Sequence, residues 1–206
     1  MKKLNIGISM REANAIGYNE KRDSIARDWY RYMHEVMPNA NWLLLPNIEK
    51  SIFSYIENWD INAFILTGGE NLGISDERDN TEKLIFEYSR KETLPILGIC
   101  RGFQLIYKLM GGSIEKQNEN FSRFHTANHH EIIIGNKKEI VNSYHSNAII
   151  ESVKPKELEI IARCKKDNTI EAYEGYNILG FMWHPEREKM FNKWGAEKIK
   201  KLFKYE

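Results

Sequence analysis

The sequence predicts an α/β fold of three layers, in which a mostly parallel central sheet is covered by helices on both faces. In the first half of the chain, short apolar strands alternate with helices across short loops, and this alternation is typical of parallel sheets. The strands Ala63–Thr67 and Leu94–Ile99 are almost entirely apolar, as expected when both faces of a strand are buried. Several short β-rich segments in the second half predict a small antiparallel addition.

The elements of the first half alternate in a regular order. Leu4–Ser9 is predicted as the first strand because it is short, β-rich and followed by a polar loop. A helix is predicted from Ser24 to about Val36, where apolar residues recur at helical spacing before Pro38. The same criteria give a strand over Asn41–Leu45, a helix over Ser51–Trp59, the strand Ala63–Thr67, a helix over Thr81–Arg90, the strand Leu94–Ile99 and a helix over Gly102–Leu109.

The second half is richer in strands. Ile178–Met182 is predicted as one more core strand, and Gly195–Phe203 as a final amphipathic helix. The chain contains no internal repeat and no Pro/Gly/Ser-rich linker, so residues 1–206 are expected to form one domain. The short segments predicted to pair in an antiparallel way are Glu131–Ile134, Glu139–Asn142, Glu159–Cys164 and Thr169–Tyr173.

Composition restricts the classes of function. Apolar residues make up 42% of the chain, enough for a sizeable core, and the net charge of +1 offers no attraction to nucleic acid or an anionic membrane. The longest apolar runs are too short to span a bilayer, and charged residues follow Met1–Ile6 where a signal peptide would need an apolar region. We therefore expect a cytoplasmic protein without nucleic-acid or membrane partners; a homo-oligomer is compatible with the sequence.

The two cysteines differ in their surroundings. Two cysteines are too few for a disulfide scaffold, and neither has the spacing of a zinc site, so no metal and no cofactor is expected. Cys164 lies in a β-rich segment, as a small buried hydrophobic residue would. Cys100, in contrast, stands where an apolar strand passes directly into a helix, flanked by Gly98 and Gly102. This G-x-C-x-G pattern is a nucleophile elbow, and the helix N-terminus there favours a thiolate.

A second motif, Trp183-His184-Pro185-Glu186, follows the last predicted core strand. A thiol nucleophile needs a base to accept its proton and a carboxylate to orient that base. His184 would lie at the same edge of the sheet as Cys100, and Glu186 could reach the far imidazole nitrogen around the Pro185 turn. The sequence therefore predicts a triad of Cys100, His184 and Glu186.

A third motif, Gly68-Gly69, also follows a predicted strand. Adjacent glycines allow a backbone N–H to point into a site without a side chain in the way. Together with the N–H of Arg101, the N–H of Gly69 would form an oxyanion hole, a large contributor to acyl transfer.

These three motifs, in this order along the chain, resemble those of the class I glutamine amidotransferases and their hydrolytic relatives. Further segments narrow the resemblance to the γ-glutamyl hydrolase branch, peptidase family C26, typified by γ-glutamyl-γ-aminobutyrate hydrolases. The resemblance implies a flavodoxin-like sandwich and attack on the side-chain amide of a γ-glutamyl group. The segments are Arg78-Asp79-x-x-Glu82, Leu94–Gly102, Gly111-Gly112 and Val141–Ala148.

The resemblance also implies a substrate pocket. Gln104 and the backbone around Asn142, Ser143, Tyr144 and His145 would hold the α-amino and α-carboxylate groups of the glutamyl moiety. Such charged groups need hydrogen bonds when they are buried.

The leaving-group side departs from the branch. The chain is compact, and it has Ser146 and Asn147 where the family usually has a second His and a Gln. A small subset of these hydrolases resembles this compact form. Those enzymes remove glutamate from γ-glutamyl nucleotide amidates in capsule phosphoramidate synthesis.

Three histidines, His125, His129 and His130, cluster in the second half. A metal site and contacts to a phosphate-bearing substrate are both compatible with them. We favour a solvated loop, because no Asp or Cys is spaced for coordination nearby.

Three other functions compete with a free-standing γ-glutamyl hydrolase. A glutaminase subunit would pass ammonia to a synthetase on another polypeptide, and the Asn142–Ala148 segment argues against it. Stress proteins and chaperones of the same fold place a His directly after the nucleophile, where this chain has Arg101. A non-catalytic binding module would not require Cys100, His184 and Glu186 together.

Overall fold

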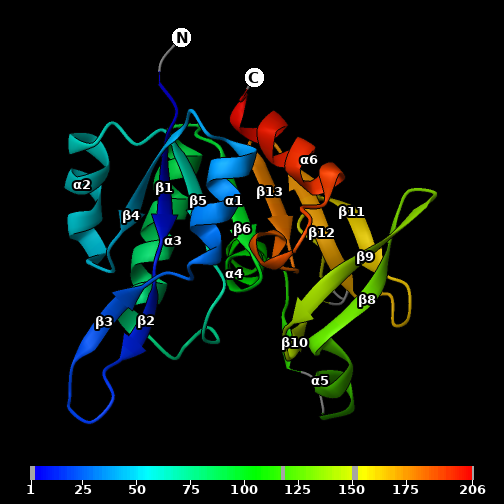
Figure 1. Ribbon diagram of the computed structural model, residues 1–206. Helices are drawn as coiled ribbons and strands as arrows, with labels where there is room; N and C mark the ends of the chain where they lie inside the picture. The colour runs from blue at the N-terminus through cyan, green and yellow to red at the C-terminus, as the bar shows by residue number, and fades with distance from the viewer. Residues whose placement is uncertain (1–2, 117–118, 150–152, 206) are drawn as a thin grey trace.

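The computed structural model describes residues 3–116, 119–149 and 153–205, and its main feature is a nine-stranded sheet. Five strands form the parallel half of the sheet, and they run in the same direction in Figure 1. In spatial order these are β4 (Asn41–Leu45), β1 (Asn5–Ser9), β5 (Ala63–Leu66), β6 (Ile96–Ile99) and β13 (Ile178–Phe181).

The antiparallel half continues the same sheet from β13. Each of these four strands pairs antiparallel with its neighbours. The predicted antiparallel addition is therefore confirmed, but it is an extension of the central sheet. In spatial order its strands are β12 (Ile170–Gly175), β11 (Glu159–Cys164), β8 (Thr126–Ile134) and β9 (Lys137–Tyr144).

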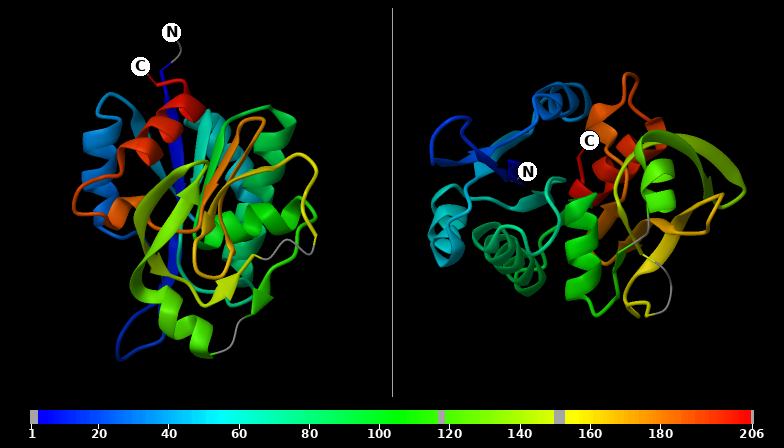
Figure 2. Two further views of the ribbon diagram at one scale, coloured as in Figure 1. Left: turned by 90° about the vertical axis from the view of Figure 1, so that its right-hand side faces the viewer. Right: turned by 90° about the horizontal axis from the view of Figure 1, so that it is seen from below.

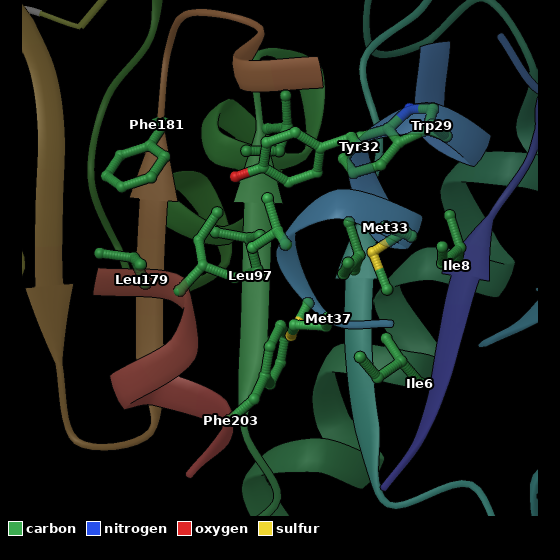
Figure 3. Packing of buried hydrophobic residues seen from close by; sticks show 14 of the residues in the cluster. Ile6, Ile8, Trp29, Tyr32, Met33, Met37, Leu97, Leu179, Phe181 and Phe203 are labelled. Carbon is green, nitrogen blue, oxygen red and sulfur yellow. The ribbon is translucent and has the colours of Figure 1, made fainter. Parts of the chain in front are cut away.

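Helices cover both faces of the sheet, as Figure 2 shows in the view from below. On one face, α1 (Asp28–Val36) and α6 (Lys193–Phe203) pack on the sheet. Figure 3 shows this core, where Trp29 and Tyr32 of α1 and Phe203 of α6 lie against strand residues such as Leu97. The other face is covered by α2 (Ile52–Asn58), α3 (Asp76–Lys91) and α4 (Arg101–Leu109). The predicted three-layer α/β/α architecture is confirmed.

The starts of two helices differ from the sequence prediction, because polar residues do not produce the hydrophobic periodicity from which a helix is predicted. Helix α3 begins at Asp76 instead of Thr81, since Ser75 caps it by accepting a hydrogen bond from the N–H of Arg78 (3.4 Å). The expected start of a helix at Ser24 is wrong. A polar hairpin of β2 (Arg11–Asn14) and β3 (Lys21–Ser24) occupies that region, and α1 begins four residues later at Asp28.

Short elements complete the fold near the carboxyl ends of the parallel strands. The β2–β3 hairpin and α5 (Glu119–His125) lie at the lower end of the molecule in Figure 1, on opposite sides. The remaining elements are the 3-10 turns η1 (Glu49–Ser51) and η2 (Pro185–Arg187) and the paired strands β7 (Glu115–Lys116) and β10 (Asn147–Ala148). Within the described ranges, no helix is both long and apolar enough to cross a membrane.

Candidate active site

Cys100 occupies a strained turn between β6 and α4. Its φ of 50° and ψ of −98° lie in a region that non-glycine residues rarely adopt. The Cys100 N–H donates to the carbonyl of Phe181 (2.8 Å), and its carbonyl accepts from the N–H of Gln104 (3.0 Å). The turn is therefore fixed on both sides by the sheet and by the first turn of α4.

The two glycines around Cys100 are required by close backbone contacts. A Cβ at Gly102 would overlap the carbonyl of Leu66 on β5, and a Cβ at Gly98 would lie 2.7 Å from the backbone of Gly102. Only glycine lets α4 start this close to the sheet.

His184 follows β13 and is oriented by a carboxylate two residues later. Its Nδ1 lies 2.7 Å from Oε1 of Glu186, and both side chains are almost completely buried. Pro185 starts the turn η2 that brings Glu186 back toward the imidazole. The sequence-predicted triad residues thus lie at one edge of the sheet, with the Cys100 sulfur close enough to His184 to raise the pKa of the imidazole.

The surroundings of His184 favour its charged form. Burial disfavours the imidazolium, but the Glu186 carboxylate and the Cys100 sulfur outweigh burial and raise the pKa of His184 to about 9. A protonated His184 beside the sulfur can stabilise a thiolate and later donate a proton.

The side chain of Asn142 on β9 forms two hydrogen bonds with the backbone of His184. The Asn142 side-chain amide donates to the His184 carbonyl (2.7 Å), and its Oδ1 accepts from the His184 N–H (3.0 Å). The Asn142 amide also donates to Oε1 of Glu188 (2.6 Å). The sequence predicted substrate contacts for the Asn142 segment. It did not reveal the contact between Asn142 and His184 or the role of Glu188, because no local sequence pattern links β9 to the turn after β13.

The Gly68-Gly69 loop lies directly against the site. A Cβ at Gly68 would overlap the His184 ring, and a Cβ at Gly69 would overlap the Arg78 guanidinium. Gly69 has a φ of 151°. Arg101 is the first residue of α4, so its N–H belongs to the helix N-terminus and lacks an intrahelical partner.

A buried ionic network ties this loop to the elbow. Arg78 donates to the carbonyls of Thr67 (3.0 Å) and Gly68 (3.1 Å) and to Oε1 of Glu82 (3.0 Å). Glu82, which is fully buried, also accepts from Arg101. Burial works against its charge, but Arg78 and Arg101 outweigh burial and hold the pKa of Glu82 below its usual range. The Arg78-Asp79-x-x-Glu82 motif therefore fixes the position of both backbone segments next to Cys100.

Gln104 and Tyr144 lie close to the triad, whereas two other predicted substrate residues point elsewhere. Gln104 is buried on α4, and its Oε1 accepts from the Asn147 amide at 3.5 Å. The Tyr144 ring meets the His184 ring edge-on, with centroids 5.7 Å apart. The side chains of Ser143 and His145 turn away, toward His125.

The expectation of a solvated histidine loop is wrong for two of the three histidines. His125 is fully buried and His130 is 5% exposed, while His129 is exposed on the opposite face of β8. The acidic residues that His125 and His130 face, Asp167 and Glu171, come from distant parts of the sequence, so local spacing could not reveal them.

Comparisons with known proteins place the chain in a family. The family model described as Peptidase C26 matches residues 6–186. A γ-glutamyl-CDP-amidate hydrolase of Campylobacter jejuni is 35% identical over 196 residues, which cover 91% of this chain and 92% of that protein. A glutamine-hydrolysing GMP synthase of Brachyspira hyodysenteriae is 33% identical, over 64% of this chain but only 26% of its own length.

The fold is also shared with solved structures. A glutamine amidotransferase from Thermotoga maritima has a TM-score of 0.63 and 12% identity, covering 99% of this chain and 84% of its own. At that identity the likeness concerns the fold alone. The family match spans most of the sequence, and the Campylobacter relative aligns along nearly its whole length. The chain therefore belongs to the Peptidase C26 family and is an amide-bond hydrolase.

Proposed function

We propose that the protein hydrolyses the γ-glutamyl amide bond of a small-molecule conjugate and releases glutamate through a γ-glutamyl thioester on Cys100. The observation that carries the proposal is the strained Cys100 at the start of α4, beside a His184 that Glu186 orients at 2.7 Å. A nucleophile next to a base, with a carboxylate that orients the base, is the arrangement that covalent acyl transfer needs.

The first half-reaction forms the thioester. The Cys100 thiolate attacks the γ-carbonyl carbon, and the N–H groups of Gly69 and Arg101 stabilise the oxyanion. His184 donates its proton to the leaving nitrogen as the C–N bond breaks.

The second half-reaction releases glutamate. His184, now neutral, takes a proton from water, and the water oxygen attacks the thioester carbon. The C–S bond breaks, which frees glutamate and restores the thiolate beside protonated His184.

The leaving group is proposed to be an anionic nucleotide amidate. The Campylobacter relative, whose name specifies a γ-glutamyl-CDP-amidate, aligns over 92% of its length. One cation beside the site supports an anionic group, because the Arg187 guanidinium lies over the Tyr144 ring at 4.6 Å. A second arginine, Arg11, has its Cβ beside Gly69. Asn147 donates to Asn71 in the loop after Gly69 (3.1 Å), so the predicted leaving-group segments meet near Gln104.

A glutaminase subunit that supplies ammonia to a separate synthetase is the second candidate. The GMP synthase similarity favours it, yet the alignment covers only 26% of the Brachyspira protein. The two candidates differ in whether a purified single chain turns over a conjugate or needs a partner.

Acid quenching during turnover tests the covalent step. A γ-glutamyl substrate should add the mass of one glutamyl group to the wild-type protein, on the peptide containing Cys100. Cys100→Ala should show no adduct and no glutamate release, while Cys164→Ala, a change at the other buried cysteine, should retain both. Glutamate release by a folded Cys100→Ala protein would exclude the cysteine mechanism.

A further inference from the structure

A cluster of buried histidines and one carboxylate lies behind the active site and takes no part in the proposed hydrolysis. His125 ends α5, His130 lies on β8, His145 follows β9 and Glu171 lies on β12. None of these four residues is more than 5% exposed. Figure 1 shows α5 next to the ends of β8 and β9.

Glu171 is the central residue of the cluster and the hardest to explain as a structural residue. It is fully buried, and within the described part of the chain neither of its carboxylate oxygens makes a hydrogen bond. One oxygen faces Nε2 of His130 at 3.4 Å, and the other faces Nε2 of His145 at 3.6 Å. A buried carboxylate without a compensating partner is strongly disfavoured.

The hydrogen bonds of His145 define which nitrogen faces Glu171. Nδ1 of His145 lies 2.8 Å from the carbonyl of Asn147. Because a carbonyl only accepts, Nδ1 carries the hydrogen. Nε2 then carries a lone pair, and it points at a carboxylate oxygen that also offers only lone pairs.

His125 is oriented in a similar way. Its Nε2 lies 2.7 Å from Oδ2 of Asp167, whose other oxygen accepts from the hydroxyl of Thr169 (2.8 Å). Nε2 of His125 therefore donates to a carboxylate, and Nδ1 keeps its lone pair. The Ser143 hydroxyl lies 3.5 Å from Nδ1, but it donates its single hydrogen at the shorter contact of 2.6 Å to the His125 carbonyl.

Potential ligand atoms of three of these residues lie close together. One donor atom from each of His125, His145 and Glu171 lies within 4.8 Å of the other two. Two ligands on one tetrahedral Zn²⁺, with bonds of about 2.0–2.1 Å, are separated by roughly 3.3 Å. The 3.6 Å between His145 and Glu171 is close to that separation, and two histidines with one glutamate form a known zinc ligand set.

The groups around these ligands also match those of a metal site. Metal-binding histidines usually donate their second ring N–H to a carboxylate or a backbone carbonyl. His125 donates to Asp167 and His145 donates to the Asn147 carbonyl. Both contacts fix the orientation of the two imidazole rings, as such contacts do for metal ligands.

We propose that His125, His145 and Glu171 bind a divalent transition-metal ion of the zinc type, while His130 faces the second carboxylate oxygen of Glu171. The ion neutralises the buried carboxylate and joins α5 and β12 to the end of β9. Tyr144, the neighbour of His145, lies against His184, so the site also holds the rim of the active site in place. The chemistry at Cys100 does not involve the ion.

Metal content of the untagged protein tests the proposal without measuring hydrolysis. The protein is stripped with a chelator and titrated with Zn²⁺ by calorimetry, and a Co²⁺-loaded sample is examined for the visible absorption of a tetrahedral site. The wild type should bind about one Zn²⁺ per chain. Glu171→Gln and His145→Gln should weaken binding by more than about 10-fold, since each removes a ligand. His129→Gln is the matched control, because His129 lies on β8 beside His130 but is exposed. This variant should bind Zn²⁺ like the wild type.

Thermal melts separate loss of the metal from loss of the fold. Zn²⁺ should raise the melting temperature of the wild type and of His129→Gln but leave that of Glu171→Gln unchanged. The stripped Glu171→Gln protein should melt no lower than the stripped wild type, because the change removes an unpaired buried charge. A wild type that binds none of Zn²⁺, Co²⁺ and Mn²⁺ would overturn the proposal in favour of a proton shared between Glu171 and a histidine. Equal Zn²⁺ binding by the wild type, Glu171→Gln and His145→Gln would overturn it as well.

Discussion

Nδ1 of His184 lies 2.7 Å from Oε1 of Glu186, although only Pro185 separates the two residues in the chain. The turn η2, which begins at Pro185, folds the carboxylate back onto the imidazole. A local turn therefore sets the orientation of the base, and the nearby Cys100 sulfur adds to the rise in the pKa of His184.

The backbone strain at Cys100 leads to a prediction about stability. Cys100→Gly should be more stable than Cys100→Ala by about 1 kcal/mol, because glycine adopts a positive φ without the steric cost that Ala and Cys incur. Urea unfolding of the two inactive variants measures the difference. Equal stabilities would mean that the elbow stores no strain.

The raised pKa of His184 predicts a pH dependence of stability. A histidine whose pKa rises from 6.5 to about 9 on folding stabilises the folded state fully below pH 6.5 and loses that contribution as the pH rises through about 9. By the usual conversion, the contribution is roughly 3 kcal/mol. The free energy of unfolding of the wild type, relative to His184→Gln, should fall across this window. A difference independent of pH between 6 and 10 would contradict a charged His184.

The roles of His184 and Glu186 predict an order of kinetic effects. His184→Ala should lower kcat more than Glu186→Gln, since the imidazole transfers a proton in both half-reactions and the carboxylate orients it. Loss of the proton transfer costs on the order of 10²–10⁴ in rate. Glu197→Gln, at an exposed position on α6, serves as the control with unchanged kcat. The reverse order for the first two variants would show that their roles are exchanged.

The contacts of Asn142 and Gln104 predict two different kinetic signatures. Asn142 brackets the backbone of His184 with hydrogen bonds of 2.7 and 3.0 Å, so Asn142→Ala should lower kcat with little change in KM. Gln104 has no such contact with the triad, and Gln104→Ala should mainly raise KM if it holds the glutamyl group. Steady-state kinetics on one γ-glutamyl substrate separate the two. A higher KM with normal kcat for Asn142→Ala would instead support direct substrate binding by that residue.

The sequence was sufficient for the parallel half of the fold and for the motifs at its edge. Apolar strands such as Ile96–Ile99 and the glycines around Cys100 carry signals that depend only on neighbouring residues. The first turn of α3 was missed because Asp76, Glu77 and Asp79 show no hydrophobic period, although Ser75 followed by acidic residues is a capping signal that could have revealed it.

Features that depend on distant partners were beyond local reasoning. The bond between Asn142 and His184 joins β9 to the turn after β13, and the burial of His125 and His130 depends on Asp167 and Glu171. Their positions follow from how the antiparallel strands pair, and no spacing within one segment encodes that pairing.

The specificity of the purified single chain is the most direct test of a free-standing γ-glutamyl hydrolase. Gln104 and the backbone of residues 142–145 would bind the glutamyl group of glutamine and of its conjugates alike, so this binding cancels in the comparison. Discrimination then comes from contacts to the leaving group, which can also lower the barrier at the scissile amide. We expect kcat/KM for a γ-glutamyl-CDP-amidate to exceed that for free glutamine by at least about 100-fold, without any partner protein. Efficient hydrolysis of free glutamine, or activity only after addition of a synthetase, would contradict this and support the glutaminase subunit.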